Sequence, residues 1–166
     1  MSAPTVAEQL VLGGRALISR EGTADLSVRR LVEAAGRSTM CVYSHFGNRK
    51  RLLAEVFRSC GEDLLAALAK ARNATDLERD YAAYARKEPR HFQYLFAADL
   101  ETFGLDQSLR LDLIDSVLDR AEAHLGGGRD EALAWWLRIH AATWLDTAQR
   151  LAGEPGRFDT EAALKR

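Results

Sequence analysis

Basic and hydroxyl side chains gather in one short stretch of the sequence, residues 27–51. Between residues 29 and 51, six arginine or lysine residues stand against a single acidic residue, Glu33. Guanidinium and ammonium groups bind phosphate, and small hydroxyls near helix N-termini do so as well. The pattern predicts a phosphate-binding surface with these candidates: Ser27, Arg29, Arg30, Tyr43, Arg49 and Lys50.

The charge of the whole chain shows that this bias is local. Its 166 residues contain 23 Lys and Arg against 24 Asp and Glu, so the net charge is -1. Residues 1–58 hold nine basic and five acidic residues, whereas the rest of the chain is acidic. Such an asymmetry indicates that the N-terminal part meets a polyanion.

The remaining reactive residues form no catalytic or metal-binding pattern. The acidic residues between 112 and 122 recur at helical spacing, which is typical of a solvated helix face. The sequence contains no GxSxG, phosphate-binding Gly-rich loop or HExxH, and its four histidines show no i, i+4 pair. We therefore expect no enzymatic activity, no cofactor and no bound metal.

Cysteine usage and hydropathy indicate the compartment. The two cysteines, Cys41 and Cys60, are too few for a disulfide framework and are typical of a reducing cytoplasm. The first residues lack the basic start and apolar run of a signal peptide, and no segment approaches about 18 consecutive apolar residues. We expect a soluble cytoplasmic protein that does not bind a membrane.

Apolar residues recur at three- and four-residue steps, so the sequence predicts an all-α protein. The first helices are expected over about 5–20, over 28–35 with Ser27 as N-cap, from the N-cap Ser38 to about 45, and from the N-cap Asn48 onward. Gly13 and Gly14 weaken the first of these by about 1 kcal/mol each relative to Ala. They are therefore expected to mark close helix packing.

Residues 27–46 fit a helix-turn-helix, because two short amphipathic helices are joined by a tight turn that contains Gly36. The second helix of such a motif enters the major groove of DNA. Val42 and Phe46 are expected to face inward. The residues left to meet bases or backbone, including two at the turn, are Arg37, Ser38, Thr39, Met40, Cys41, Ser44 and His45.

The same stretch carries a family resemblance. Residues 22–53 resemble the DNA-binding domain of the tetracycline-repressor (TetR) family of bacterial transcriptional regulators, through Ser27-Val28-Arg29, Ala34-Ala35-Gly36, Val42-Tyr43-Ser44-His45-Phe46, Asn48-Arg49 and Leu52-Leu53. The resemblance implies that Ser27, Tyr43 and Arg49 contact phosphates and that Thr39 and its neighbours read bases. Met40, Cys41, Gly47 and Arg49 depart from the usual family residues Gly, Thr, Pro and Lys.

Two alternatives stand beside this interpretation. Residues 27–57 can also be read as a basic helical subdomain whose arginines are merely solvated. Cys41 can be read as a small residue on the second helix or as a redox sensor whose oxidation releases DNA.

The rest of the chain predicts further helices. A capping box at Thr75-Asp76-Leu77-Glu78 opens a helix that Pro89 ends or interrupts, and an aromatic-rich stretch follows over 90–100. Two long amphipathic helices are expected over about 108–125 and 130–152, on either side of Gly126-Gly127-Gly128. The polar tail allows a turn or two of helix from Asp159.

The aromatic residues of this second part resemble one branch of the same family. Its alanine-rich helix, Pro step and aromatic helix match residues 82–99, and its Trp-x-x-x-His-Gly signature matches Trp136 to Ala141 with Ala in place of Gly. The resemblance implies a ligand cavity with the candidates Phe92, Phe96, Phe103, Trp136, His140 and Trp144. Aromatic side chains at helical spacing are also typical of a core or a dimer seam, and this alternative stays open.

The sequence thus predicts an N-terminal three-helix helix-turn-helix DNA-binding domain, residues 1–47, and a C-terminal helical bundle for dimerisation and ligand binding, residues 48–166. The expected function is that of a transcriptional regulator, most often a repressor. It would act as a homodimer on a pseudopalindromic double-stranded DNA operator and be released by a small apolar or aromatic effector. The alternative is a DNA-binding dimer without an effector, whose helical domain serves only dimerisation or protein contact.

Overall fold

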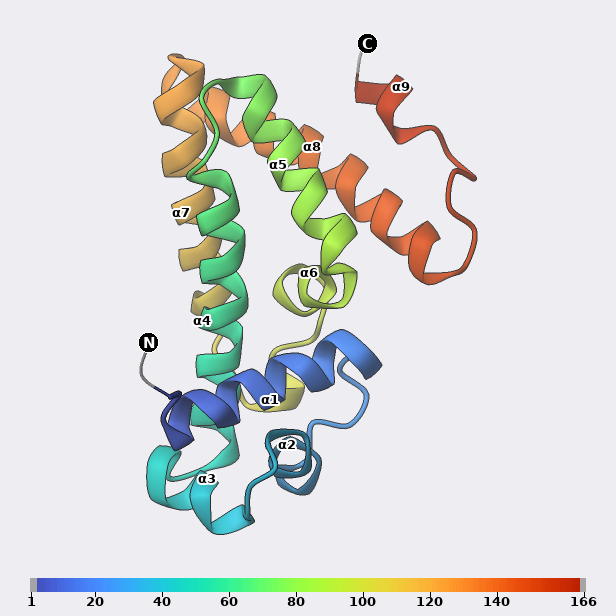
Figure 1. Cartoon of the computed structure of the whole chain (residues 1–166). Coiled ribbons are helices and arrows are strands. Elements are labelled where there is room, and N and C mark those ends of the chain that lie inside the picture. The colour runs from blue at the N-terminus through green and yellow to red at the C-terminus, as the bar shows by residue number, and fades with distance from the viewer. Residues whose placement is uncertain (1–2, 165–166) are drawn as a thin grey trace. The chain divides into compact units, whose positions relative to one another are not determined.

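The structure is a computed structural model that describes residues 3–164, and every regular element within this range is helical. The prediction of an all-α protein is confirmed. The helices are α1 (Val6–Glu21), α2 (Val28–Ala35), α3 (Thr39–Phe46), α4 (Arg49–Leu68), α5 (Ala74–Lys87), α6 (Pro89–Phe96), the 3-10 turn η1 (Glu101–Phe103), α7 (Ser108–Leu125), α8 (Gly128–Leu151) and α9 (Thr160–Leu164) (Figure 1).

Contacts divide the chain into two compact units. The first unit consists of Met1–Glu62 and Arg90–Leu111, and the second unit of Asp63–Pro89 and Asp112–Arg166. The helices α4 and α7 each contribute residues to both units. These units are defined by contacts and not by function. The predicted boundary between a DNA-binding and an effector-binding domain, at residues 47 and 48, stays a prediction.

Helix α1 begins where the sequence places it and is closed at both ends by local hydrogen bonds. Thr5 and Glu8 form a capping box, in which the Thr5 backbone N–H donates to Glu8 Oε2 over 2.6 Å and the Glu8 N–H donates to Thr5 Oγ1 over 3.2 Å. The helix ends at Gly22, whose φ of 79° is available to glycine at little cost. Leu10, Leu17 and Ile18 are buried on one face of α1.

Two adjacent glycines let α1 approach its neighbours closely, as the sequence predicts. A Cβ on Gly13 would lie 2.6 Å from the Cβ of Ala35 and 2.7 Å from its Cα, and a Cβ on Gly14 would lie 2.7 Å from Val56 Cγ2. Such contacts are shorter than packed side chains tolerate, so these positions require glycine. Helix α1 is therefore in direct contact with α2 at Gly13 and with α4 at Gly14.

The two serines predicted as N-caps of α2 and α3 hold the N-cap backbone position, but their side chains make no capping hydrogen bond. Ser38 Oγ instead lies 3.5 Å from Cys41 Sγ. Gly36, with a φ of 63°, ends α2 and turns the chain toward α3. Local capping therefore contributes less to this motif than its packing on α1.

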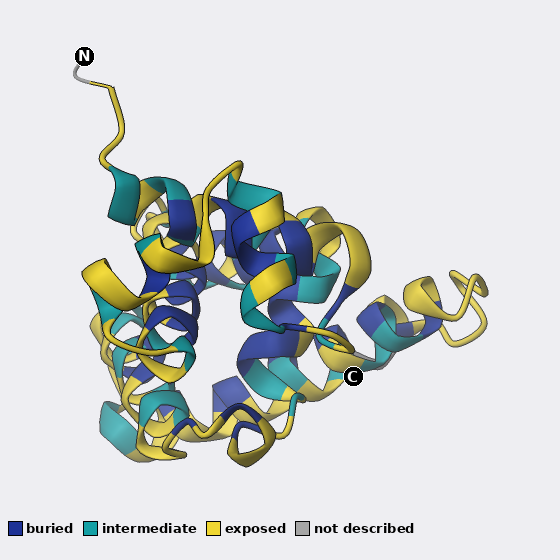
Figure 2. Ribbon diagram, turned by 90° about the horizontal axis from the view of Figure 1, so that it is seen from below, coloured by how far each residue is buried: buried dark blue, intermediate teal, exposed yellow. Residues whose placement is uncertain are grey.

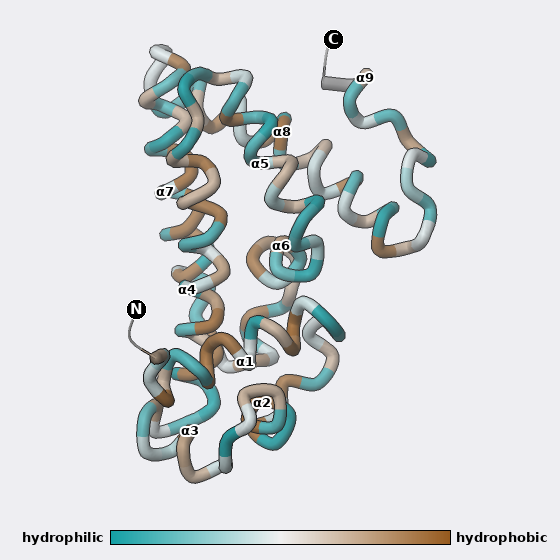
Figure 3. The backbone as a smooth tube through the Cα atoms, in the orientation of Figure 1, coloured by the Kyte–Doolittle hydropathy of each residue, from teal (hydrophilic) through white to brown (hydrophobic). Residues whose placement is uncertain are grey.

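Helix α4 contains the apolar stripe that the sequence predicts. Asn48 caps it, since the Arg51 N–H donates to Asn48 Oδ1 over 2.9 Å. Apolar residues recur along the helix (Figure 3), and these are buried: Leu53, Val56, Phe57, Cys60, Leu64 and Leu68. In the first unit Tyr94 packs edge-on against Phe57 and donates its hydroxyl to the Leu53 carbonyl.

The capping box expected at Thr75 is wrong. The N-cap of α5 is Asn73, whose Oδ1 accepts the Asp76 N–H over 2.9 Å, so the helix begins earlier and Glu78 falls outside the N3 position. Asp76 is buried and accepts hydrogen bonds from Arg72 and Arg79. The hydrogen bond from Arg72 is the main cause that lowers the pKa of Asp76 to about 2.

The core of the second unit includes a hydrogen-bonded group of three side chains on α5 and α8. The indole N–H of Trp136 donates to the Tyr81 hydroxyl over 3.2 Å, and that hydroxyl lies 2.9 Å from His140 Nδ1. The His140 ring stacks on Trp136 with centroids 4.7 Å apart. Burial lowers the pKa of His140 to about 4, so the imidazole is neutral near pH 7 and shares a hydrogen bond with the Tyr81 hydroxyl at Nδ1.

The C-terminal residues pack on α8 and α5. The Gln149 side-chain amide donates to the Phe158 carbonyl over 3.2 Å and accepts the Phe158 N–H over 2.9 Å. Arg86 forms ion pairs with Asp146 and with Glu161 of α9. In both units buried positions lie on the inner sides of the helices and exposed ones on the outer sides (Figure 2).

We expect Gly13→Ala to destabilise the protein. Helix propensity alone favours Ala by about 1 kcal/mol, but the new methyl would press on the backbone of Ala35. Overpacking of this kind costs about 1 to 3 kcal/mol, so a net loss in the free energy of unfolding is expected by urea denaturation. Ala16→Gly, at an exposed position of α1, measures the propensity term alone. A more stable Gly13→Ala variant would contradict the close packing.

The neutral state of His140 predicts a pH-dependent stability. Its folded pKa of about 4 lies below the ordinary 6.5, so between these values the unfolded chain binds a proton that the native chain does not. The stabilisation that comes from keeping His140 neutral is complete above pH 6.5 and is lost as the pH falls toward 4. The free energy of unfolding should therefore fall by about 2 kcal/mol between pH 7 and pH 5.

Urea denaturation at pH 7, 6 and 5 measures this dependence. His140→Gln keeps a hydrogen-bond acceptor but does not titrate, so its stability should fall less over the same range. If the free energy of unfolding fell equally with pH in the unchanged chain and in the His140→Gln variant, His140 would not titrate in this way.

Candidate nucleic-acid interface

The predicted helix-turn-helix is formed by α2 and α3, which pack on each other and on α1 in the first unit. Leu31 of α2 and Val42 of α3 are fully buried, so the prediction for Val42 is confirmed. Phe46, at the end of α3, is only half-buried. One side of α3 is thus fixed in the core, and its opposite side faces solvent.

The solvent side of α3 carries the residues expected to read bases. Met40 is 70% exposed, and Thr39, Ser44 and His45 are exposed as well. Tyr43, which was predicted to contact a phosphate, is 55% exposed on the same side. Residues 39, 40, 43 and 44 share one face, since positions three and four apart are neighbours on a helix. Exposed side chains of this size reach base edges if the helix enters a major groove.

The other two candidates in and beside α3 are engaged locally. The Ser44 hydroxyl donates to the carbonyls of Met40 and Cys41, so it presents only its free lone pairs outward. Cys41 is half-buried, and its hydrogen bond with Ser38 lowers the pKa of its thiol. Cys41 is thus held at the start of α3 and Ser44 near its end.

The basic candidates fall into two kinds. Arg37 donates to Gln9 of α1, and Arg49 donates to the Leu26 carbonyl over 3.4 Å, so both also hold the motif together. Arg30 pairs with Glu21 of α1. Arg29 and Lys50 are exposed, and neither makes a hydrogen bond or ion pair within the part of the chain that the structure describes. Among the predicted candidates, these two are the cations best able to bind phosphate without breaking a contact.

One further cation, Arg51, belongs to this surface although it is not among the predicted site residues. Arg51 is exposed on the first turn of α4, directly after Lys50. Its signal was present in the run Arg49-Lys50-Arg51. Tyr81, which contacts both Trp136 and His140, could not be found in this way, because it lies on α5 and the residue spacing of α8 does not indicate it.

The residues predicted to line a ligand cavity belong to different units. Phe92, Phe96 and Phe103 lie in the first unit, where Phe92 packs on Phe96 and Phe103 packs edge-on against Tyr94. Trp136, His140 and Trp144 lie on α8 in the second unit, and Trp144 is 48% exposed. A shared cavity for these six residues stays a prediction.

Residues 3–164 contain neither a metal-binding cluster nor a helix suited to cross a membrane. Among residues 3–164 no group of three or more His, Cys, Asp or Glu side chains is arranged to hold a metal ion. No helix in the same range combines the length and apolarity needed to cross a bilayer.

Comparisons with known proteins agree with this geometry. Residues 10–56 match the family model for bacterial regulatory proteins of the tetR family. This segment contains most of α1, all of α2 and α3 and the start of α4. No curated protein matches the chain significantly.

Solved structures share the fold over nearly the whole chain. SCO7518 of Streptomyces coelicolor A3(2), whose assignment as a transcriptional regulator is provisional, has a TM-score of 0.74 at 21% identity, with 98% of this chain and 95% of that chain covered. NalD of Pseudomonas aeruginosa, the secondary repressor of the MexAB-OprM multidrug efflux pump, has a TM-score of 0.60 at 16% identity, with 96% and 90% covered. The similarity to the tetR family of bacterial regulatory proteins thus covers residues 10–56 of this chain, the segment that contains its helix-turn-helix.

Proposed function

We propose that this protein is a sequence-specific DNA-binding transcriptional regulator that acts as a repressor. The observation that carries the proposal is the solvent face of α3, which is exposed next to free cations while its opposite face is buried at Val42. In a helix-turn-helix the second helix reads the major groove while neighbouring cations bind phosphates. The likeness of the fold to NalD supports the choice of a repressor.

Within this proposal the residues have separate roles. Thr39, Met40 and Tyr43 face base edges or the adjacent backbone, and Arg29, Lys50 and Arg51 bind phosphates. Met40 adds an apolar contact, which suits the methyl group of thymine. Arg37 and Arg49 bind phosphate while their contacts with Gln9 and Leu26 orient them.

The acting form is a homodimer, supported by an apolar stripe on α8. Leu133, Leu137 and Trp144 are all exposed at helical spacing, and Leu151 continues the stripe. Monomeric proteins seldom expose large apolar side chains in a row, so a second copy is the natural cover. A twofold dimer would place two α3 helices on half-sites about 34 to 36 Å apart on a pseudopalindromic operator.

Release from DNA by a small apolar or aromatic effector completes the proposal. We assign the neutral His140, which stacks on the Trp136 ring, as the polar group that orients the effector. The resemblance to the Trp-x-x-x-His-Gly branch supports this role. A ligand that binds a conformation incompatible with the operator shifts the population off DNA.

One observation favours the alternative of a dimer without effector. Tyr81 is fully buried, and both Trp136 and His140 already direct polar atoms at its hydroxyl. In this alternative the group acts as a packed core, and α8 serves dimerisation only.

Selection of bound fragments from random double-stranded DNA tests the regulator directly. We expect recovery of a pseudopalindrome whose binding weakens steeply with salt, because each phosphate contact releases counterions. Thr39→Ala should change the preferred sequence. Lys50→Gln should weaken binding to all sequences alike and lower the salt slope by about one unit.

Lys70→Gln is the matched control, since it removes the same charge from an exposed position in the second unit. Lys50 is preferred to Arg49 because Arg49 also binds the Leu26 carbonyl. If no fragment were enriched, the proposed sequence-specific DNA binding would be refuted. If the Thr39 and Lys50 variants lost affinity equally on every sequence, the division of roles between base and phosphate contacts would be refuted.

The dimer interface gives a separate prediction. Leu137→Glu places a charge in the α8 stripe and should convert the dimer to a monomer, with a loss of operator affinity, in analytical ultracentrifugation. Because Leu137 is 55% exposed, the fold should be unaffected. Ala83→Glu on the exposed side of α5 is the control and should remain dimeric. A dimeric Leu137→Glu chain would rule out this face.

A further inference from the structure

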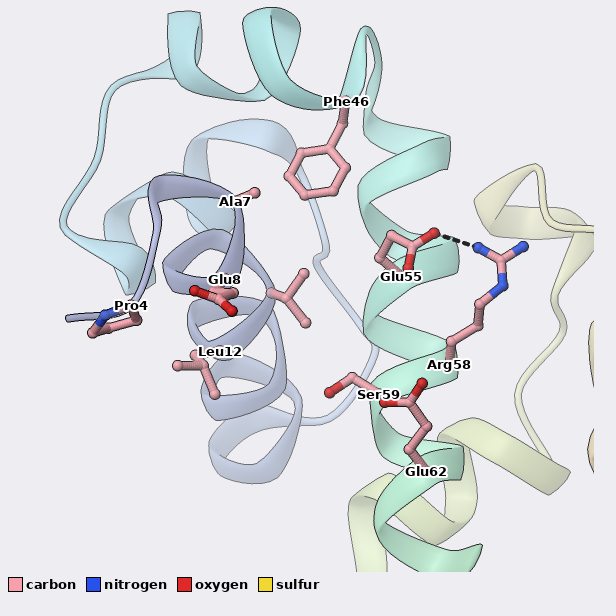
Figure 4. A pocket seen from close by; sticks show the side chains of 10 residues that line it. Pro4, Ala7, Glu8, Leu12, Phe46, Glu55, Arg58, Ser59 and Glu62 are labelled. Carbon is pink, nitrogen blue, oxygen red and sulfur yellow. Dashed lines mark hydrogen bonds and ion pairs between the residues drawn. The ribbon is translucent and has the colours of Figure 1, made fainter. Parts of the chain in front are cut away.

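An open groove lies in the first unit, at the far side of the DNA-reading motif from its solvent face. It measures about 640 Å³, within the range typical of small-molecule sites. The groove runs between α1, whose side chains form its floor, and the middle of α4, from Glu55 to Glu62, and Phe46 of α3 closes one end (Figure 4). Every residue that lines it belongs to the first unit.

The floor of the groove is apolar and open to solvent. Ala7, Val11 and Leu12 of α1 contribute aliphatic side chains, and Leu12 remains 50% exposed. The ring of Phe46 faces the space between α1 and α4 (Figure 4). Contact with an apolar ligand would remove these side chains from water, and burial of apolar surface is favourable.

The two helices are fixed to each other beside the groove. Gly14 meets Val56 at a distance that leaves no room for a Cβ, and Arg15 donates to Ser59 Oγ over 3.0 Å. Both contacts join α1 to α4 within the first unit. The groove is therefore a preformed feature of the packing, which lowers the cost of binding.

The rim of the groove is acidic. Glu8, Glu55 and Glu62 line it, together with one cation, Arg58. Arg58 pairs with Glu55, and its guanidinium lies on the side of α4 away from α1 (Figure 4). Glu8 accepts the Thr5 N–H. Glu62 makes no hydrogen bond or ion pair among the residues the structure describes.

We propose that this groove binds a lipophilic cation, a small molecule with an apolar body and one delocalised or quaternary positive charge. The apolar floor holds the body, and the Glu62 and Glu8 carboxylates attract the charge. The ring of Phe46 adds a cation–π contact. An anion of the same shape meets the same floor but is repelled by the rim, which gives the site its selectivity.

The position of the groove gives binding a consequence. Phe46 is the last residue of α3, so a ligand against its ring acts on the end of the helix that, under the proposed function, reads DNA. This step rests on the proposed function, whereas the binding site itself does not. If the cation changes DNA affinity, DNA must change the affinity for the cation by the same factor.

Two ions of nearly equal size and shape provide the test: tetraphenylphosphonium as the cation and tetraphenylborate as the anion. Isothermal titration of the full chain without DNA should show binding of tetraphenylphosphonium at a single site and at least tenfold weaker binding of tetraphenylborate. Glu62→Gln should weaken cation binding about fivefold, the upper range for one exposed charge pair, and less so at high salt. Leu12→Gln should weaken it by a similar factor.

Glu122→Gln is the matched control, because Glu122 is an exposed helical carboxylate in the second unit. Its affinity for tetraphenylphosphonium should equal that of the unchanged chain. Absence of binding, equal binding of both ions, or binding that neither Glu62→Gln nor Leu12→Gln alters would each overturn the site.

Titration of the same cation into the complex with the selected operator tests the coupling. We expect an altered DNA affinity that Glu62→Gln diminishes. An unchanged DNA affinity would overturn the coupling. Failure to bind any DNA would overturn the proposed function, and the titration without DNA would still decide the groove.

Discussion

The close approach of α1 to its two neighbours is the constraint on which the first unit depends. Gly13 and Gly14 present bare backbone on one turn of α1, and α2 and α4 rest on that turn. Any side chain there would displace the helix that leads into α3 or the helix that follows it. Polar contacts from Arg37 to Gln9 and from Arg15 to Ser59 then fix the same two neighbours from the outside.

Much of the fold could be predicted because it follows from local chemistry. The bounds of α2 and α7 follow from Ser27, Gly36 and the glycine turn at 126–128, and the α4 stripe follows from apolar spacing. The start of α5 could not be predicted, because Asn73 and Thr75 are both acceptable caps. Asn73 is the cap in the structure, where Asp76 is buried and paired with the exposed Arg72 and Arg79. Local sequence does not show which carboxylate will be buried.

Some residues of the candidate sites could likewise be predicted from the sequence, and others could not. The motif around α3 could be predicted because its residues lie within about twenty positions of one another. The partners of Trp136 and His140 could not, because Tyr81 is supplied by α5 and only folding brings it to α8. The groove beside Phe46 was equally hidden, since its walls come from α1 and α4 and no single segment carries its pattern.

The hydrogen bonds that hold the two ends of α3 also affect the entropy of its association with a partner. The turn before α3 is held by Arg37 on α1, and the turn after it by Arg49 on the Leu26 carbonyl. A segment restrained at both ends has little backbone freedom left to lose when it meets a partner, and ordering a free residue costs about 1 to 2 kcal/mol. The surface of α3 thus meets its target already ordered, and only the long exposed side chains, Met40 above all, still have conformations to give up.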